Sequence, residues 1–189
     1  MHQHPPLVLA SQSPRRRQLL AEAGFQFSIR TYDVEETYPD DMPAEEVAVY
    51  LARKKAGAGA ADLREGEVLL TADSVVILDG EIFGKPRDYD DAFRMLRRLS
   101  GQTHTVITGV CLMNREKQKS FAGVSKVTFA ALNDAEIEFY LKEYQPYDKA
   151  GSYGVQDWIG LCKVVRIEGT YANVMGLPVD LVYEALGTF

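Results

Sequence analysis

The chain has 189 residues, a net charge of −6 and 46 % hydrophobic residues, with a sequence pI near 5.1. These values are ordinary for a globular protein and allow one domain or two fused lobes whose core needs no disulfide or metal for support. The acidic balance argues against broad, nonspecific nucleic-acid binding, which requires a basic surface. It still permits a small anionic ligand, because a few local cations can dominate one site.

No apolar run approaches the roughly 20 residues of a membrane span, and residues 1–6 lack a charged segment followed by an apolar one. We therefore expect neither a membrane helix nor a signal peptide. The two cysteines, Cys111 and Cys162, fall in expected strands, and neither belongs to a CxxC pair. This pattern favours buried free thiols in a reducing compartment over a disulfide or a zinc site, and it predicts a cytoplasmic protein.

Apolar periodicity, helix caps and turn residues predict the elements of the chain. In the first half they are a strand over 7–10, a helix over 15–24, a strand over 25–32, a helix over 43–61, a strand over 68–78 and a returning strand over 81–83. In the second half they are a helix over 88–99, antiparallel strands over 104–113 and 120–130, a helix capped at Asp134 that ends near 144, a strand over 161–167 and a closing helix over 178–186. This order predicts an α/β protein with a mixed sheet.

The segment 10–16 is the first candidate for chemistry. A strand that leads into a capped helix leaves backbone N–H groups without helix partners, and the helix dipole adds about half a positive charge there. Two serines and two arginines at this point suit a polyphosphate; they are Ser11, Ser13, Arg15 and Arg16. The alternative interpretation is a surface helix with a solvated basic first turn.

A carboxylate, Asp73, stands within the apolar strand expected over 68–78. An unpaired buried charge costs roughly several kcal/mol. We therefore expect residues 71–74 to interrupt the strand, with Asp73 either exposed to water at a bulge or placed at a strand end as a catalytic group. The neighbouring carboxylates Glu35 and Glu36 either hold Mg²⁺ beside a phosphate or form a solvated turn.

Two loops complete the set of candidates. Lys85 follows the expected hairpin between Gly84 and Pro86 and is either a solvated turn residue or a phosphate ligand. Gln156 ends a polar, glycine-rich loop over 148–156, which is either an ordinary loop or a substrate-facing one whose amide can read a base edge. In the cluster 53–55, successive residues face different sides of a helix, so at most two reach one site. No Ser–His or Cys–His nucleophile is apparent, and His104 is interpreted as a strand histidine with its hydrogen bonds satisfied. Metal-assisted attack by water on a phosphoanhydride is the most economical chemistry.

Taken in order, eight segments resemble the Maf family of nucleoside triphosphate pyrophosphatases, and the resemblance extends from Leu7 to Phe189. The segments are LASQSPRR from Leu9, VEE from Val34, LARKKA from Leu51, ADSVV from Ala72, GKP from Gly84, LSGQTH from Leu99, DKAGSYGVQ from Asp148 and GLP from Gly176. The resemblance implies a single domain over 1–189, with a mixed twisted sheet in two lobes around a central cleft, similar to the inosine triphosphatase fold. It also implies a divalent cation, Mg²⁺ or Mn²⁺, and a homodimer.

The resemblance assigns roles to individual positions. Asp73 matches the proton acceptor of the family, and the charged cleft residues are matched by Arg16, Glu36, Lys55 and Lys85. In the family patterns Lys55 aligns rather than Lys54, and Glu36 rather than Glu35. The metal is expected on Glu36 and Asp73.

The resemblance also extends to a substrate subgroup. Arg15, Ser74 and Gln156 stand where members directed at dTTP and UTP carry an arginine, a small hydroxyl residue (commonly threonine) and a glutamine. The resemblance therefore implies attack by water at the α-phosphorus of dTTP or UTP, which yields the monophosphate and pyrophosphate. The acidic composition and the lack of a long apolar run predict no nucleic-acid or membrane partner. Two alternatives stay open. One is a pyrophosphatase directed at 7-methyl-GTP, and the other is a nucleotide-binding regulator of cell division and septum formation without essential catalysis.

Overall fold

The computed structural model describes residues 4–189 and confirms the expected mixed α/β class. Within these residues a seven-stranded sheet has the strand order β2-β1-β3-β5-β6-β7, and β4 pairs with β3 beside this path. The sheet is mixed because β1 pairs in parallel with β2 and β3, whereas β3 with β4 and β6 with β7 are antiparallel. Residues 1–3, part of the segment in which we expect no signal peptide, lie outside this range.

The chain divides into two compact units. Unit 1 comprises the chain up to Asp73 together with Thr108–Gly123 and Gly176–Phe189, and unit 2 comprises Ser74–Ile107 and Val124–Met175. Three long strands contribute residues to both units; they are β3 (Val68–Leu78), β5 (Thr103–Met113) and β6 (Gln118–Phe129).

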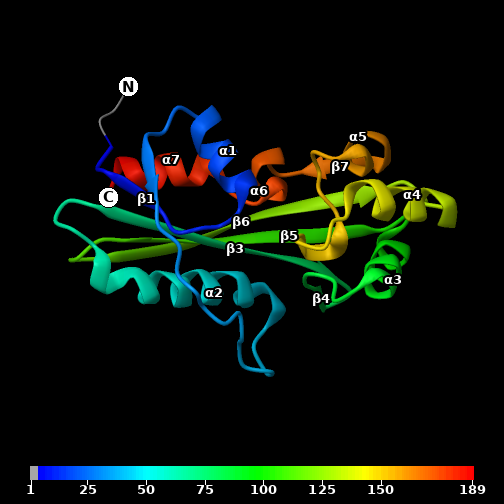
Figure 1. Ribbon diagram of the computed structural model, residues 1–189, viewed down its shortest axis with the longest axis horizontal. Helices are drawn as coiled ribbons and strands as arrows, with labels where there is room; N and C mark the ends of the chain where they lie inside the picture. Colours follow the sequence, from blue (N-terminus) through cyan, green and yellow to red (C-terminus); the bar gives the residue numbers. More distant parts are fainter. Residues whose placement is uncertain (1–3) are drawn as a thin grey trace. The chain divides into compact units, whose positions relative to one another are not determined.

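Unit 1 holds the parallel part of the sheet. In it, Leu7 of β1 is in register with Phe27 of β2 and with Val68 of β3. Its helix α2 covers one face of these strands, and α1 and α7 lie on the other face (Figure 1). The elements that belong wholly to this unit are β1 (Leu7–Leu9), α1 (Pro14–Glu22), β2 (Phe27–Ile29), α2 (Ala44–Gly59), the 3₁₀ helix η1 (Ala60–Asp62) and α7 (Val179–Gly187).

Helix α2 packs unusually close to the strands beneath it. Thr71 of β3 is fully buried, and its hydroxyl donates to the carbonyl of Ala52 at 2.7 Å. On β5, a Cβ atom at Gly109 would lie 2.3 Å from the carbonyl carbon of Ala48, a distance that no side chain tolerates. These two contacts fix the position of α2 along the strands, and with it the direction of the side chains in its C-terminal half.

Unit 2 contains the other ends of the long strands. The turn between β3 and β4 is the tight hairpin that Asp79–Gly80 predicts, with φ of 53° and 78° at these residues. Asn173 secures α6, since its amide donates to the Val106 carbonyl at 3.2 Å and to Ser125 Oγ at 2.9 Å. The elements wholly in this unit are β4 (Glu81–Phe83), α3 (Tyr89–Leu99), α4 (Asp134–Tyr144), the 3₁₀ helix η2 (Ala150–Ser152), α5 (Trp158–Lys163), β7 (Val164–Glu168) and α6 (Tyr171–Met175).

Several expectations were wrong in detail. The strand expected over 161–167 begins only at Val164, because residues 158–163 form helix α5. Cys162 consequently lies exposed on this helix rather than in a buried strand, whereas Cys111 is buried in β5 as expected. The cap of α4 is Asn133 rather than Asp134, and Asn133 forms a reciprocal capping box with Glu136. The second strand is shorter than expected, Phe27–Ile29.

No helix in the described part of the chain combines the length and the apolar character that crossing a membrane requires.

Candidate active site

Asp73 lies in the middle of a continuous strand, which corrects the expected interruption of β3. Residues 71–74 keep the strand conformation, and the Asp73 side chain is only 11 % exposed. The reason is a partner that the strand pattern alone does not reveal, since Lys55 of α2 donates a hydrogen bond to Asp73 Oδ1. Pairing with a cation offsets part of the desolvation cost of a buried carboxylate, whereas an unpaired buried carboxylate keeps the full cost.

Lys55 joins two carboxylates. Its Nζ, bonded to Asp73, also lies 2.8 Å from Glu36 Oε1. Glu36 belongs to the exposed segment between β2 and α2, so residues from three separate parts of unit 1 meet at one ammonium group. The contact involves Glu36 of the acidic pair.

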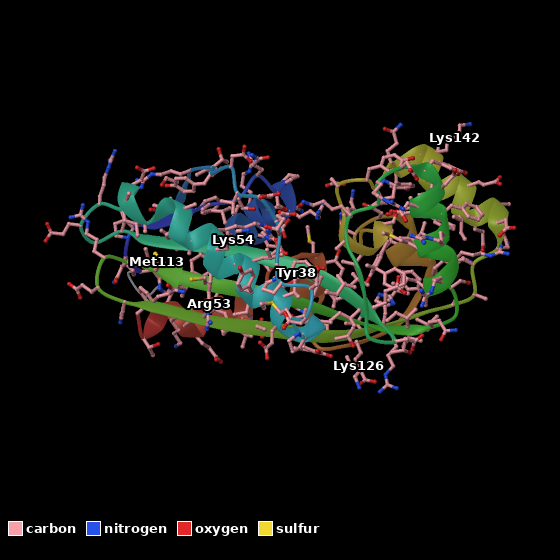
Figure 2. The ribbon with its side chains drawn as sticks, turned by 90° about the horizontal axis from the view of Figure 1, so that it is seen from below. Tyr38, Arg53, Lys54, Met113, Lys126 and Lys142 are labelled. Carbon is pink, nitrogen blue, oxygen red and sulfur yellow. The ribbon has the colours of Figure 1, made fainter. Side chains whose placement is uncertain are left out.

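The neighbours of Lys55 on α2 point elsewhere, as the helix spacing predicts. Lys54 donates to the carbonyl of Thr37 at 3.0 Å and to its hydroxyl at 2.8 Å. Figure 2 shows Arg53 and Lys54 leaving different sides of α2. Because consecutive helical residues are turned by about 100°, only Lys55 of this cluster contacts the carboxylates.

Arg16 fastens the start of α1 to the strand that carries Asp73. Its Nε donates to the Gly176 carbonyl at 2.7 Å and its Nη1 to the Ala72 carbonyl at 2.8 Å. Burial lowers the pKa of Arg16, and the nearby carboxylates of Asp73 and Glu36 act in the opposite direction. The guanidinium nevertheless stays charged, as arginines in proteins do. Arg16 therefore adds a fixed positive charge beside the two carboxylates.

The serines before α1 organise the turn into the helix. Ser11 Oγ accepts from the N–H of Ser13 at 3.2 Å, and Ser13, the N-cap residue, accepts from the N–H of Arg16 at 3.5 Å. Arg15, in the first turn of the helix, is partly buried. Unit 1 thus brings together seven of the expected site residues, at the start of α1 and around Lys55: Ser11, Ser13, Arg15, Arg16, Glu36, Lys55 and Asp73.

Three further expected residues belong to unit 2. Ser74 follows Asp73 on β3, and Lys85 is exposed just after β4. The Gly84 carbonyl before Lys85 accepts from the N–H of Gly151 at 3.0 Å, which ties the end of the hairpin to the glycine-rich loop. Gln156 ends this loop half-buried, and no residue in the described range donates a hydrogen bond to its buried Oε1.

The two carboxylates of unit 1 suit a hard cation. Glu36 and Asp73 already converge on one positive charge, and carboxylate oxygens are the ligands that Mg²⁺ prefers. Residues 4–189 contain no group of three or more His, Cys, Asp or Glu side chains that could enclose a metal. Mg²⁺ commonly binds through one or two carboxylates, waters and the phosphates of a substrate. The residues therefore fit a divalent ion that arrives with a polyphosphate.

The structure places His104 in the strand β5 as a structural histidine, but the expectation that its hydrogen bonds are satisfied was wrong, because within residues 4–189 its buried Nδ1 has no hydrogen-bond partner. Its Nε2 lies 2.7 Å from the hydroxyl of Tyr153, and its ring packs edge-on against Phe129. Burial lowers the pKa of His104 to about 4. The ring is therefore neutral at physiological pH, and the partner of its Nε2 is the hydroxyl of Tyr153 rather than a serine or a cysteine.

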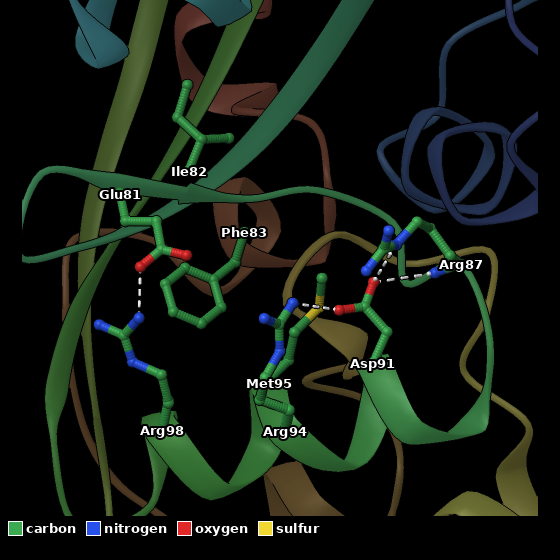
Figure 3. A pocket seen from close by; sticks show the side chains of 8 residues that line it. All are labelled: Glu81, Ile82, Phe83, Arg87, Asp91, Arg94, Met95 and Arg98. Carbon is green, nitrogen blue, oxygen red and sulfur yellow. Dashed lines mark hydrogen bonds and ion pairs between the residues drawn. The ribbon is translucent and has the colours of Figure 1, made fainter.

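A separate pocket lies in unit 2 between β4 and α3, and it contains none of the expected site residues (Figure 3). Its buried carboxylate, Asp91, pairs with Arg87 and Arg94. On the other side, Arg98 pairs with Glu81 and lies over the ring of Phe83, 5.2 Å from its centroid. Each arginine that lines this pocket therefore has a carboxylate partner within it.

Sequence reasoning missed two polar residues of unit 2. Tyr140 and Asp157 hydrogen-bond to each other next to Gln156. Tyr140 follows Ile137 and precedes Leu141 on the buried stripe of α4, so its position is typical of an ordinary core residue. The only signal was a hydroxyl on that stripe, since a buried tyrosine hydroxyl usually has a hydrogen-bond partner.

The fold and the site define a mixed α/β protein in which an arginine-bearing, serine-capped helix start adjoins two carboxylates bridged by a lysine. The chain matches the family model described as Maf-like protein over residues 6–189, and it belongs to this family.

Relatives of similar length carry a common name. The chain is 51 % identical to the dTTP/UTP pyrophosphatase of Phocaeicola vulgatus, over 95 % of this chain and 94 % of the relative. It is 50 % identical to that of Porphyromonas gingivalis, over 97 % and 94 %, and 46 % identical to that of Flavobacterium psychrophilum, over 94 % and 91 %. Among solved structures, that of the Staphylococcus aureus Ham1 protein covers 66 % of this chain and 72 % of its own, at 17 % identity and a TM-score of 0.48.

Proposed function

We propose that this protein hydrolyses dTTP and UTP to the nucleoside monophosphate and pyrophosphate. The observation that carries the proposal is the pair of carboxylates, Asp73 and Glu36, bridged by Lys55 beside the basic start of α1. Pure binding of a triphosphate calls for cations alone, whereas hydrolysis also needs a group that accepts a proton from water. Relatives about 50 % identical over nearly the whole chain bear the corresponding name.

In this proposal the triphosphate binds at the start of α1, against Ser11, Ser13, Arg15 and Arg16. Asp73 accepts a proton from the attacking water, whose oxygen forms a new bond to the α-phosphorus. The bond from that phosphorus to the bridging oxygen breaks, and pyrophosphate leaves. Lys55 and Lys85 neutralise the charge that develops on the transferred and leaving groups.

A divalent cation, Mg²⁺ or Mn²⁺, is part of the proposal. Glu36 and Asp73 would hold it, with water and phosphate oxygens as further ligands. When bound, it would withdraw charge from the phosphate oxygens and lower the pKa of a water molecule. Lys55 contacts both carboxylates and offsets part of their negative charge.

Base selection is assigned to Gln156, Arg15 and Ser74. Uracil and thymine present an N3–H donor, whereas cytosine presents an acceptor at this position. The Gln156 Oε1, which accepts no hydrogen bond within residues 4–189, is therefore matched to uracil and thymine. Removal of the amide by Gln156→Ala should relax the base preference more than it lowers turnover.

We also propose that the protein acts as a homodimer in the cytoplasm, without a nucleic-acid or membrane partner. The family resemblance supports the dimer, and the net charge of −6 supports the absence of nucleic acid. Light scattering in solution should give twice the chain mass of 21.1 kDa.

The role of Asp73 is tested by Asp73→Asn, with Asp91→Asn as the matched control. Both residues are buried carboxylates paired with cations, but Asp91 belongs to the pocket between β4 and α3. Removing a general base lowers the rate by about 10²–10⁴-fold, so kcat for dTTP should fall by this amount in Asp73→Asn. Asp91→Asn should retain kcat at a temperature at which it is folded. Near-normal turnover by a folded Asp73→Asn protein would exclude the assigned role.

A further inference from the structure

Tyr140 of α4 holds a short turn of unit 2 through a single hydroxyl group. The side chain is fully buried, and its hydroxyl donates to Asp157 Oδ2 at 2.7 Å while it accepts from the N–H of Gly154 at 3.0 Å. Gly154 and Asp157 are the two ends of the turn, which the N–H of Asp157 closes onto the Gly154 carbonyl at 3.0 Å. One hydroxyl therefore fastens both ends of the turn to a helix.

The turn in question carries Gln156. A Cβ atom at Gly154 would lie 2.7 Å from Gln156 Nε2 and 2.6 Å from Asp157 Oδ2, so both side chains fold back over the glycine backbone. The Gln156 amide is thus held against the same few atoms that Tyr140 fastens. Its Oε1 is buried and accepts no hydrogen bond from the part of the chain that the structure describes. An unpaired buried acceptor costs free energy that a ligand N–H would recover.

The Tyr140 hydroxyl stays protonated, and its helix is held by further contacts. Burial, reinforced by the hydrogen bond to Asp157, raises the pKa of Tyr140, so the hydroxyl keeps the proton that it donates. The Asn133–Glu136 capping box fixes the start of α4, and the Tyr140 ring stacks on that of Tyr144 at 5.1 Å. The helix therefore presents the hydroxyl at one place.

We propose that Tyr140 is a positioning residue for base selection, which places the Gln156 amide through the turn Gly154–Asp157. The inference rests on the proposed hydrolysis of dTTP and UTP, because it concerns how that site distinguishes one base from another. Tyr140 itself contacts no substrate. Its hydroxyl sets the position and direction of the Gln156 amide, which contacts the base.

The test compares Tyr140→Phe with the wild-type protein by the ratio of kcat/KM for dTTP to that for CTP. Loss of both hydrogen bonds of the hydroxyl and release of the turn should lower this ratio about tenfold. The change should appear in KM for dTTP, with kcat within about threefold of wild type. Tyr144→Phe is the matched control, since Tyr144 lies one turn further along the same helix and is 40 % exposed. It should leave the ratio unchanged.

A double-mutant cycle separates positioning from a general loss of structure. In a Gln156→Ala background, Tyr140→Phe should lower the ratio no further, because the amide through which it acts is gone. Asp157→Asn, which weakens the same contact, should lower the ratio in the direction of Tyr140→Phe, and it serves as the test if Tyr140→Phe does not fold.

Two outcomes overturn the inference: a wild-type ratio in folded Tyr140→Phe, which includes an equal loss on dTTP and CTP, or full additivity with Gln156→Ala. Absence of dTTP and UTP hydrolysis by the wild-type protein is a different result, since it removes the proposed function first and the inference with it.

Discussion

At the scale of single residues, the site depends on how the chain accommodates buried charge. The sequence identified Asp73 as exceptional, since a carboxylate inside an apolar strand needs an explanation. It did not identify the partner of Asp73, because this residue, Lys55, lies 18 residues earlier on another element. The same limit applies to Tyr140, whose hydrogen bonds to Gly154 and Asp157 cannot be read from its place on an apolar stripe. Spacing along one element predicts candidate residues, whereas partners on other elements require the fold.

His104 should make the stability of the protein depend on pH in a defined window. Its pKa is lowered by burial to about 4 in the folded protein, against an ordinary value of 6.5 when unfolded. Between these two pKa values, His104 binds a proton in the unfolded chain and stays neutral in the folded protein. The stabilisation is therefore complete above pH 6.5 and declines as the pH falls toward 4, by up to about 3 kcal/mol.

The measurement is urea unfolding of the wild type and of His104→Phe between pH 4 and 8. The carboxylates Asp91, Glu67 and Glu136, whose pKa values are lowered by their hydrogen bonds, also titrate at the acid end, so the difference between the two curves isolates His104. The variant should lose less stability than the wild type between pH 6.5 and 4. Parallel curves would show that His104 is not kept neutral by the fold.

At the scale of elements, agreement with the sequence was best where local signals were strong. Ser13 and Pro14 mark the start of α1, and the bounds of β3 are those expected, 68–78. The prediction failed after Asp157 because α5 has six residues, too few to show a helical period, and its apolar residues also fit a strand. The sequence did not predict the close packing of α2 either, because a glycine in a strand does not indicate which element packs against it.

Gly109, where β5 contacts α2, and Gly57, on the exposed side of α2, offer a matched pair of substitutions. Gly109→Ala would drive a methyl group into the backbone of α2 at Ala48, so the free energy of unfolding should fall by about 3 kcal/mol or more. Gly57 lies on the exposed side of α2, where an added Cβ atom would meet no other atom within 4 Å. Gly57→Ala should raise the free energy of unfolding by about 0.5–1 kcal/mol, through helix propensity alone.

Chemical denaturation of both variants measures the two effects. A Gly109→Ala protein as stable as the wild type would mean that α2 does not lie this close to β5. Activity provides a second readout for Gly109→Ala, because a displaced α2 carries Lys55 away from Asp73.

At the scale of the whole molecule, the chain passes repeatedly between its two units. Each unit is built from separate stretches of sequence, and β3, β5 and β6 contribute residues to both. The sequence predicted the α/β class and the resemblance predicted two lobes, but neither indicated that the dividing points fall inside strands. Asp73 and Ser74, adjacent in β3, belong to different units for this reason.

This connectivity predicts a single cooperative unfolding transition. Because the strand backbone continues from one unit into the other, neither unit can lose its strands alone. Trp158, the only tryptophan of the chain, reports on unit 2 by fluorescence, and far-UV circular dichroism reports on the helices of both units. The two denaturation curves should coincide. Separate midpoints would show that the units unfold independently.

The central claim is the hydrolysis of pyrimidine triphosphates at the cluster of Asp73, Glu36 and Lys55. It is tested most directly by pyrophosphate release from dTTP, UTP, CTP, ATP, GTP and 7-methyl-GTP, with Mg²⁺ or Mn²⁺ and with a chelator. We predict metal-dependent release, fastest from dTTP and UTP, with one monophosphate formed for each pyrophosphate. Preference for 7-methyl-GTP would contradict the base selection assigned to Arg15, Ser74 and Gln156. No release from any of the six, by folded protein that still binds nucleotide, would contradict catalysis and favour a regulatory nucleotide-binding protein.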